Sequence, residues 1–149
     1  MELVREAVLH AELGVNLFPG PTPTGMSIVA PVTGGWVKGE RLNGTVTGPG
    51  ADWLLVGNDG YGRLDVRVQM VTDDGACIYA YYDGVLEMNE AFMAASGSDG
   101  STDFGDNYFR TLVRMETGDE RYAWVNTTVF VGCGRAHENG VEYELYRVT

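Results

Sequence analysis

The sequence is 149 residues long, 44% of its residues are apolar, and its formal net charge is −11. This length and apolar content suit one domain with its own core and are too small for two comparable domains. The acidic excess argues against nucleic acid and anionic membranes as partners, because affinity for both comes largely from Lys and Arg.

Strand signals begin near the N-terminus and recur to the end of the chain. Apolar and polar residues alternate in short segments, and Gly, Pro, Asn and Asp separate these segments. In the clearest segment, 64–71, apolar residues alternate with polar ones, and the turn sequence Thr72-Asp-Asp-Gly75 follows. The predicted strands are, in chain order, residues 3–13, 26–32, 36–46, 52–56, 64–71, 76–82, 108–116, 122–131 and 141–148.

One segment, 86–95, has the composition of a short helix, and the Ser-, Gly- and Asp-rich residues 96–105 after it are predicted to form a loop. Short connections between about nine strands favour an antiparallel meander, and closure into a barrel would remove its exposed edges. The sequence therefore predicts a single all-β domain over residues 1–149. We expect a closed antiparallel barrel of about eight or nine strands with one short helix.

Cysteine and histidine are rare in the sequence. Cys77 and Cys133 lie in apolar runs, so we expect two buried thiols, with a single disulfide bridge as the alternative. His10 and His137 are the only histidines, which excludes a His-rich metal site, and we predict neither a metal nor a cofactor. No secretion signal is visible and no stretch approaches the ~20 apolar residues of a membrane span, so we expect a cytoplasmic protein.

Several short motifs resemble those of the uncharacterised DUF3237 (UPF0311) family. They occur in the same order over roughly residues 25 to 148. The resemblance implies a lipocalin-like or related β-barrel and a tendency to form homo-oligomers, and it implies no activity. The motifs are Pro31-Val-Thr-Gly-Gly35, Gly39-Glu-Arg-Leu-Asn-Gly-Thr-Val46, Gly50-Ala-Asp-Trp53, Leu64-Asp-Val-Arg67, Tyr108-Phe-Arg-Thr111, Tyr122-Ala-Trp-Val-Asn126 and Tyr146-Arg-Val148.

Polar and aromatic residues occupy one face of several predicted strands. If these faces point inward, they surround a pocket for an oxygen-bearing organic molecule. The candidate catalytic residues are then Asp65, Tyr79 and Arg67, and the candidate binding residues are Arg41, Asn43, Asp52, Trp53, Tyr108, Arg110, Trp124 and Asn126. In the opposite orientation the apolar face of 64–71 points inward, and Asp65 and Arg67 form a surface ion pair. Trp53 and Trp124 would then be core aromatics, and Asp52 would close a turn.

These residues favour a small-molecule-binding barrel that acts as a cofactor-independent enzyme. An isomerase, hydratase/dehydratase or cyclase would act on a carbonyl-containing or phenolic compound, with Asp65 as general base and Arg67 or Arg110 holding an oxyanion. The alternatives are a non-catalytic binding barrel and an oligomeric structural module. The expected partners are a small-molecule ligand or substrate and further copies of the chain, as a dimer or larger homo-oligomer, but no nucleic acid and no membrane.

Overall fold

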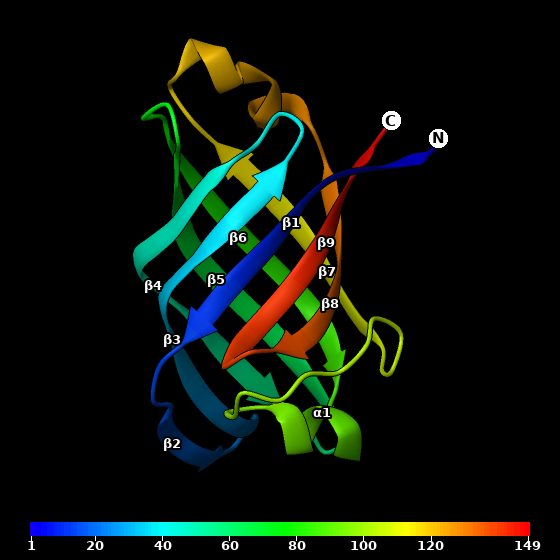
Figure 1. Ribbon diagram of the computed structural model, residues 1–149. Helices are drawn as coiled ribbons and strands as arrows, with labels where there is room; N and C mark the ends of the chain where they lie inside the picture. Colours follow the sequence, from blue (N-terminus) through cyan, green and yellow to red (C-terminus); the bar gives the residue numbers. More distant parts are fainter.

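The structure is a computed structural model that describes residues 1–149, and it consists mainly of long β-strands (Figure 1). Its elements are β1 (Leu3–Leu13), β2 (Leu17–Thr22), β3 (Gly25–Gly39), β4 (Gly44–Val56), β5 (Tyr61–Thr72), β6 (Cys77–Glu87), α1 (Glu90–Ala95), β7 (Phe109–Glu116), the 3-10 helix η1 (Glu120–Thr127), β8 (Phe130–His137) and β9 (Gly140–Val148). No helix is long and apolar enough to cross a membrane.

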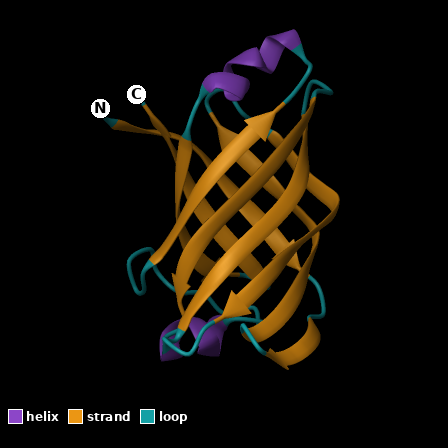
Figure 2. Cartoon of the chain, turned by 180° about the vertical axis from the view of Figure 1, so that it is seen from behind, coloured by secondary structure: helices purple, strands orange, loops and turns teal.

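The strands form a closed antiparallel barrel (Figure 2). Strands β3 to β9 pair in chain order, and β1 closes the sheet by pairing with both β9 and β3. Strand β2 adds to β3 and is hydrogen-bonded on that one side only. The prediction of a closed barrel of eight or nine strands with one short helix is confirmed.

The period-two alternation of the sequence decides which side chains fill the barrel. In β5 the apolar residues Leu64, Val66, Val68 and Met70 are buried, whereas the polar residues between them lie on the outer surface. Strand β7 follows the same pattern from Phe109 to Met115. Twenty-five buried residues form one hydrophobic cluster inside the barrel. The orientation with the apolar faces inward is therefore the correct one.

Two predicted strands are wrong. Residues 36–46 contain the end of β3, a turn and the start of β4, because the Asn43 side chain accepts a hydrogen bond from Gly39 N (3.2 Å) and closes the turn. Residues 122–131 contain η1 and only the first residues of β8. Their aromatic and β-branched composition favours a strand, but Asp119 caps the helix by accepting from Arg121 N (3.0 Å).

Other element boundaries also differ from prediction. Helix α1 is shorter than the predicted helix, since β6 continues to Glu87 and Asn89 caps the helix by accepting from Phe92 N (3.0 Å). Strand β2 and most of β8 were not predicted as strands. Both cysteines are free thiols, but Cys77 is exposed and Cys133 is only half-buried, so the expected burial of both is wrong.

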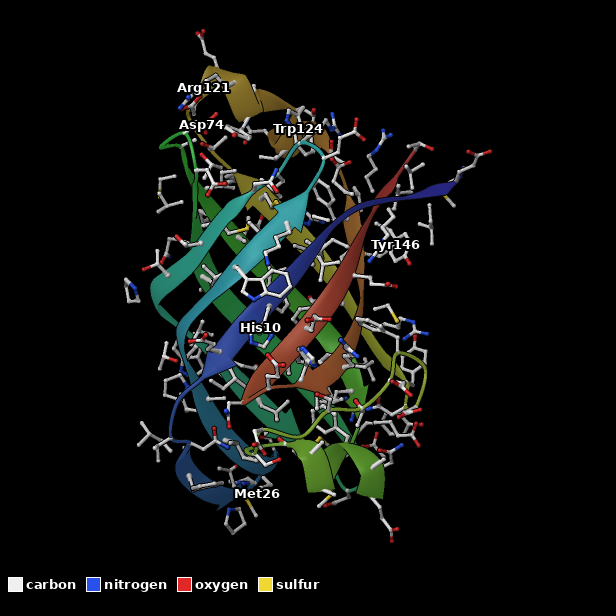
Figure 3. All side chains as sticks on the ribbon, viewed as in Figure 1. His10, Met26, Asp74, Arg121, Trp124 and Tyr146 are labelled. Atoms are coloured by element: carbon white, nitrogen blue, oxygen red, sulfur yellow. The ribbon has the colours of Figure 1, made fainter.

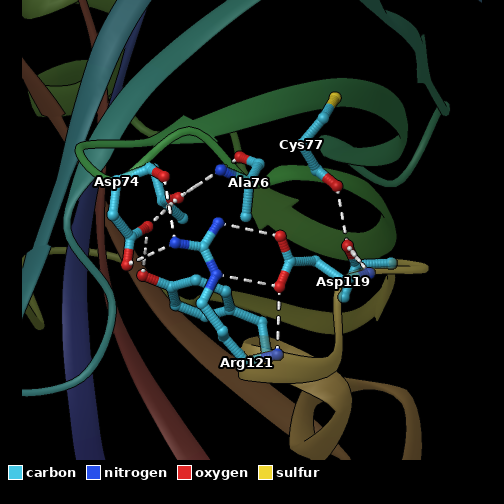
Figure 4. A network of polar contacts seen from close by, with 8 residues as sticks. Asp74, Ala76, Cys77, Asp119 and Arg121 are labelled. Carbon is cyan, nitrogen blue, oxygen red and sulfur yellow. Dashed lines mark hydrogen bonds and ion pairs between the residues drawn. The ribbon is translucent and has the colours of Figure 1, made fainter.

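Helix η1 covers one end of the barrel, and α1 and β2 lie at the other (Figure 1). Figure 4 shows how η1 is attached to the turn between β5 and β6. Arg121 pairs with Asp119 (2.9 Å) and reaches Asp74 (3.4 Å), and the hydroxyl of Tyr122 donates to Asp74 (2.8 Å). Each contact is exposed and weak by itself. Together they hold η1 over the barrel end that is opposite to α1.

The predicted loop 96–105 runs along the outside of β8. Ser101 forms an isolated bridge with His137, and its hydroxyl lies 2.8 Å from His137 Nδ1. His137 Nε2 in turn lies 3.5 Å from a carboxylate oxygen of Glu142. Ser101 is exposed, His137 is half-buried and Glu142 is buried. None of the three lines the larger cavities, so these contacts attach the loop to the barrel wall.

Replacing Gly134 by alanine should destabilise the protein by about 1–3 kcal/mol, because a Cβ there would lie 2.8 Å from the ring of Phe109. The ring is fully buried and cannot move outward. Thermal unfolding of Gly134→Ala measures this cost. Gly118→Ala is the matched control, since nothing lies within 4 Å of a Cβ at Gly118. Equal melting temperatures for the two variants would contradict the prediction.

Candidate functional site

The barrel encloses a cavity at the end where α1 and β2 lie. The cavity has a volume of about 100 Å³, and 15 of its 18 lining residues are hydrophobic. Strands β1, β3, β4, β5, β6, β7 and β9 and helix α1 contribute to its wall. The lining residues are Ala11, Leu13, Asn16, Ile28, Ala30, Val32, Asp52, Leu54, Leu64, Val66, Tyr82, Leu86, Met88, Phe92, Ser96, Phe109, Val141 and Tyr143.

Asp52 is the one ionisable carboxyl group in this wall. Asp52 lies on β4, and its pairing partners on the neighbouring strands are Ala30 on β3 and Val66 on β5. Both partners are buried inside the barrel. One carboxylate oxygen, Oδ1, accepts a hydrogen bond from the backbone N–H of Asp65 (3.0 Å). Between the residue pairs Asp52–Val66 and Leu55–Arg63, strands β4 and β5 form no backbone pair, and the side-chain bond of Asp52 lies in this gap. The side chain therefore both joins the two strands and faces the cavity.

The surroundings of Asp52 strongly change its acidity. Burial raises the pKa of Asp52 from 3.8 to about 7, and the charge of Asp65 adds to this rise, while the hydrogen bond from the Asp65 N–H opposes it. Desolvation disfavours the ionised form of a carboxyl group, which is why an apolar wall has this effect. At neutral pH both forms of Asp52 are populated. A carboxyl group in this state can both accept and release a proton.

The other polar groups of the cavity wall come from Asn16, Ser96 and two tyrosines. The rings of Tyr82 and Tyr143 meet edge to face at 5.4 Å, and both side chains are buried. Burial raises the pKa of both hydroxyl groups above the ordinary value of 10, and an ionised Asp52 raises them further. Both tyrosines therefore stay neutral and can donate hydrogen bonds at physiological pH. Asp52, Tyr82 and Tyr143 all line the same cavity.

The cavity contains no cationic side chain, since none of its lining residues is Arg, Lys or His. It can therefore solvate a neutral carbonyl or hydroxyl group through Asp52 and the tyrosines, but it cannot neutralise a carboxylate. No group of three or more His, Cys, Asp and Glu side chains is arranged to hold a metal ion.

The three predicted catalytic residues lie outside the barrel. Asp65 and Arg67 are exposed on the outer face of β5, and Tyr79 lies on the outer face of β6. Arg67 donates to the hydroxyl of Tyr79 (2.7 Å), and the ring of Tyr79 stacks on Tyr81 at 5.3 Å. The predicted inward orientation of these residues is wrong, because the apolar residues that alternate with them fill the interior instead.

Four predicted binding residues lie at the η1 end, remote from the cavity. Arg41 forms two hydrogen bonds of 2.8 Å with the buried carboxylate of Glu6, and its guanidinium stacks over Trp124 at 3.8 Å. Asn43 closes the turn between β3 and β4. Asn126 exchanges hydrogen bonds with the backbone of Thr117. Figure 3 shows Trp124 at this end and Met26 at the opposite one. None of these four residues lines the cavity, and Asn126 instead lines an open depression of the surface together with Tyr79.

The remaining predicted residues divide between the two faces of the wall. Trp53 is 48% exposed on the outside of β4. Arg110, on the outside of β7, packs against the exposed ring of Tyr108 at 5.3 Å. Asp52 alone of the predicted residues lines the cavity.

Sequence reasoning missed Tyr82 and Tyr143. A signal for Tyr82 was present, because it alternates with Ile78 and Ala80 on the apolar side of β6. Asp52 likewise alternates with Leu54 on the apolar side of β4. A single polar residue on an otherwise apolar strand face is therefore the sequence signal of this site.

Comparison with known proteins supports the fold over its full length. The family model described as "Protein of unknown function (DUF3237)" matches residues 2–148. A UPF0311 protein of Rhodopseudomonas palustris (strain TIE-1) is 30% identical over 144 residues, which cover 94% of this chain and 92% of that protein.

Several solved structures have the same fold as this chain. A conserved protein of unknown function from Rhodopseudomonas palustris is 30% identical and superposes with a TM-score of 0.89, covering 99% of this chain and 97% of that one. A structure described as an enzyme from Penicillium herquei has a TM-score of 0.73 at 20% identity, covering 99% and 94%. At that identity the likeness concerns the fold alone. Because the family model spans nearly the whole chain, this protein belongs to the DUF3237 family.

Proposed function

We propose that the protein is a cofactor-independent enzyme that transfers a proton within a small, neutral carbonyl or phenolic compound bound in the barrel cavity. Asp52 acts as the general acid–base. The observation that carries the proposal is the position of this carboxyl group, with a pKa raised to about 7, in a cavity that is otherwise almost entirely apolar. Strongly perturbed carboxyl groups in enclosed cavities are concentrated at catalytic sites.

The reaction that these groups support is an isomerisation by way of an enol. Ionised Asp52 takes a proton from the carbon next to a carbonyl group, and the electron pair of that C–H bond forms the C=C bond of an enolate. Tyr82 or Tyr143 donates a hydrogen bond to the enolate oxygen, where the negative charge collects. In a β,γ-unsaturated ketone the enolate is conjugated with the neighbouring C=C bond, so Asp52 can return its proton to the γ-carbon, and the remaining C=C bond ends in conjugation with the carbonyl group. A carboxyl base beside a tyrosine donor in an apolar pocket is a known arrangement for this chemistry.

The lining of the cavity restricts the substrate. Arg67 and Arg110 lie outside the barrel, so neither can hold a carboxylate in the cavity, and no other cation lines it. An ionised substrate would lose its hydration without gaining a counter-ion. We therefore expect a neutral substrate, and the oxyanion-holding role predicted for Arg67 or Arg110 is not part of the proposal.

A non-catalytic binding barrel is the second candidate, and one observation favours it. The hydrogen bond from Asp65 N to Asp52 gives this carboxyl group a structural role in joining β4 to β5. The same cavity would then carry a small apolar ligand, with Asp52 and the tyrosines only orienting it. The likeness to an enzyme from Penicillium herquei does not decide between the two, because one fold can serve many functions.

Exchange of the α-protons of 2-butanone in deuterated buffer tests the proposal without knowledge of the natural substrate. We expect the wild-type protein to accelerate exchange at pH 7 above a buffer blank, as followed by proton NMR. Asp52→Asn should lower the accelerated rate about 100-fold, since general-base catalysis contributes factors of this size. Asp83→Asn is the matched control, because Asp83 is exposed on the outer face of β6. Undiminished exchange in Asp52→Asn would refute the catalytic role, and binding of 2-butanone without exchange would favour the binding barrel.

A further inference from the structure

A groove on the surface of the barrel borders the cavity. The groove has a volume of about 480 Å³ and shares Leu13, Asn16 and Ser96 with the cavity wall. It lies where the connection from β1 to β2 passes the end of α1 and the hairpin between β8 and β9. Its lining residues are Leu13, Gly14, Val15, Asn16, Phe18, Ser96, Gly97, Asn139 and Gly140. Together the cavity and the groove reach the size of ordinary small-molecule sites, ~300–1,000 Å³.

The walls of the groove are held together by backbone hydrogen bonds. Asn139 N donates to Ser98 O (2.8 Å), and Leu13 N donates to Asn139 O (3.0 Å). Gly14 N donates to Pro31 O on β3 (2.8 Å). Four segments that are distant in the sequence are thus joined beside one opening. The groove is therefore part of the folded barrel and does not depend on a ligand to form.

The groove is uncharged and partly apolar, since three of its nine lining residues, Leu13, Val15 and Phe18, are hydrophobic. None of its lining residues is charged, although the chain as a whole carries a net charge of −11. Val15 and Phe18 line the groove and are 88% and 67% exposed. Exposed apolar side chains that lie close together often mark a binding surface. Leu17, Met26 and Met93 are further exposed apolar residues of β2, β3 and α1, at the same end of the barrel (Figure 1).

We infer that the ligand of this protein is an elongated molecule with a small neutral carbonyl or hydroxyl head in the cavity and an unbranched apolar tail in the groove. The inference rests on the proposed function, because it takes the cavity as the position of the head. Two observations support it. The cavity of about 100 Å³ holds little more than the reacting end of an organic molecule, and an uncharged groove lies directly beside it, because Leu13, Asn16 and Ser96 line both.

Binding of 2-butanone and 2-octanone to the full-length protein tests this inference. Each additional methylene group, if fully buried, strengthens binding about fourfold. We therefore expect 2-octanone to bind at least ten times more tightly than 2-butanone in NMR titrations. The double variant Val15→Ser, Phe18→Ser should lose this preference and keep its affinity for 2-butanone. Leu3→Ser, Val129→Ser is the matched control, since both residues are exposed and neither lines the groove.

Each outcome has a separate meaning. If neither ketone binds, the proposed function fails and the inference fails with it. If both bind equally, or if the groove variant keeps the preference for 2-octanone, the inference is overturned while the proposed function stands. Octanoate binding as tightly as 2-octanone would also overturn it, because the site offers no cation. If the groove variant changes only the sedimentation of the protein, a second copy of the chain occupies the groove and the inference is wrong.

Discussion

The free energy of unfolding should fall as the pH rises from 5 to 8, and Asp52→Asn should remove most of this fall. In the folded chain burial raises the pKa of Asp52 to about 7, whereas an unfolded chain has the ordinary value of 3.8. Between these two values the folded state binds the proton more tightly. The stabilisation by protonated Asp52 is therefore complete below pH 4 and is lost as the pH passes 7. The shift corresponds to at most about 4 kcal/mol, and to less where water enters the cavity.

Urea denaturation at pH 5 and pH 8 measures this effect. Asp52→Asn should be more stable than the wild type at pH 8, because it has no charge to bury, while Asp83→Asn should follow the wild type. Asp59, Asp74 and Asp119 act in the opposite sense, since hydrogen bonds from their partners lower the pKa of each. Their contribution is lost only as the pH falls below 4, outside the range compared. Burial lowers the pKa of His10, so His10 opposes the effect of Asp52 within this range, and the difference between the wild type and Asp52→Asn isolates the contribution of Asp52. Parallel pH profiles for wild type and Asp52→Asn would show that Asp52 is ionised in the folded protein.

Phe109→Ala should destabilise the protein by about 3–5 kcal/mol, the range for removing a buried aromatic side chain. Phe109 is fully buried, and its ring meets Tyr143 at 5.3 Å and Phe92 of α1 at 5.7 Å. The truncation would leave a void in the wall of the cavity, and the rings of Tyr143 and Phe92 would lose their packing partner. The substitution should therefore weaken both the packing of the barrel wall and the packing of α1 against it.

Leu112→Ala is the control for Phe109→Ala on the same strand. Leu112 lies on the outer face of β7 and is 39% exposed, so its truncation should cost under ~1 kcal/mol. Urea denaturation at one pH compares the two variants with the wild type. Equal losses for Phe109→Ala and Leu112→Ala would contradict the assignment of the inner and outer faces of β7.

The alternation of apolar residues carried most of the information about the fold. Strand 64–71 and strand 141–148 could be predicted because one face of each is apolar and turn residues bound them. The segment at η1 could not, since Tyr122, Trp124 and Val125 favour a strand by composition. Its 3-10 helix depends on the cap at Asp119 and on contacts with the distant turn at Asp74, and tertiary contacts of this kind override local preference.

The site was harder to predict than the fold for a physical reason. A barrel of this size is filled by its own side chains, so conspicuous polar residues such as Asp65 and Arg67 lie outside, where water solvates them. The informative residue was Asp52, which interrupts an apolar face. The approach of Tyr82 to Tyr143 depends on the closure of the barrel, which brings β6 and β9 to opposite sides of one narrow interior.

Strand β2 has a consequence for the behaviour of the protein at high concentration. It is hydrogen-bonded only to β3, so its other side is a free sheet edge beside the exposed side chains of Leu17 and Phe18. Such an edge invites strand addition by another molecule, the first step toward aggregation. Pro19 and Pro21 interrupt this strand and have no N–H to offer a new neighbour. The chain can therefore keep an apolar rim around its groove without that rim becoming a template for β-aggregation.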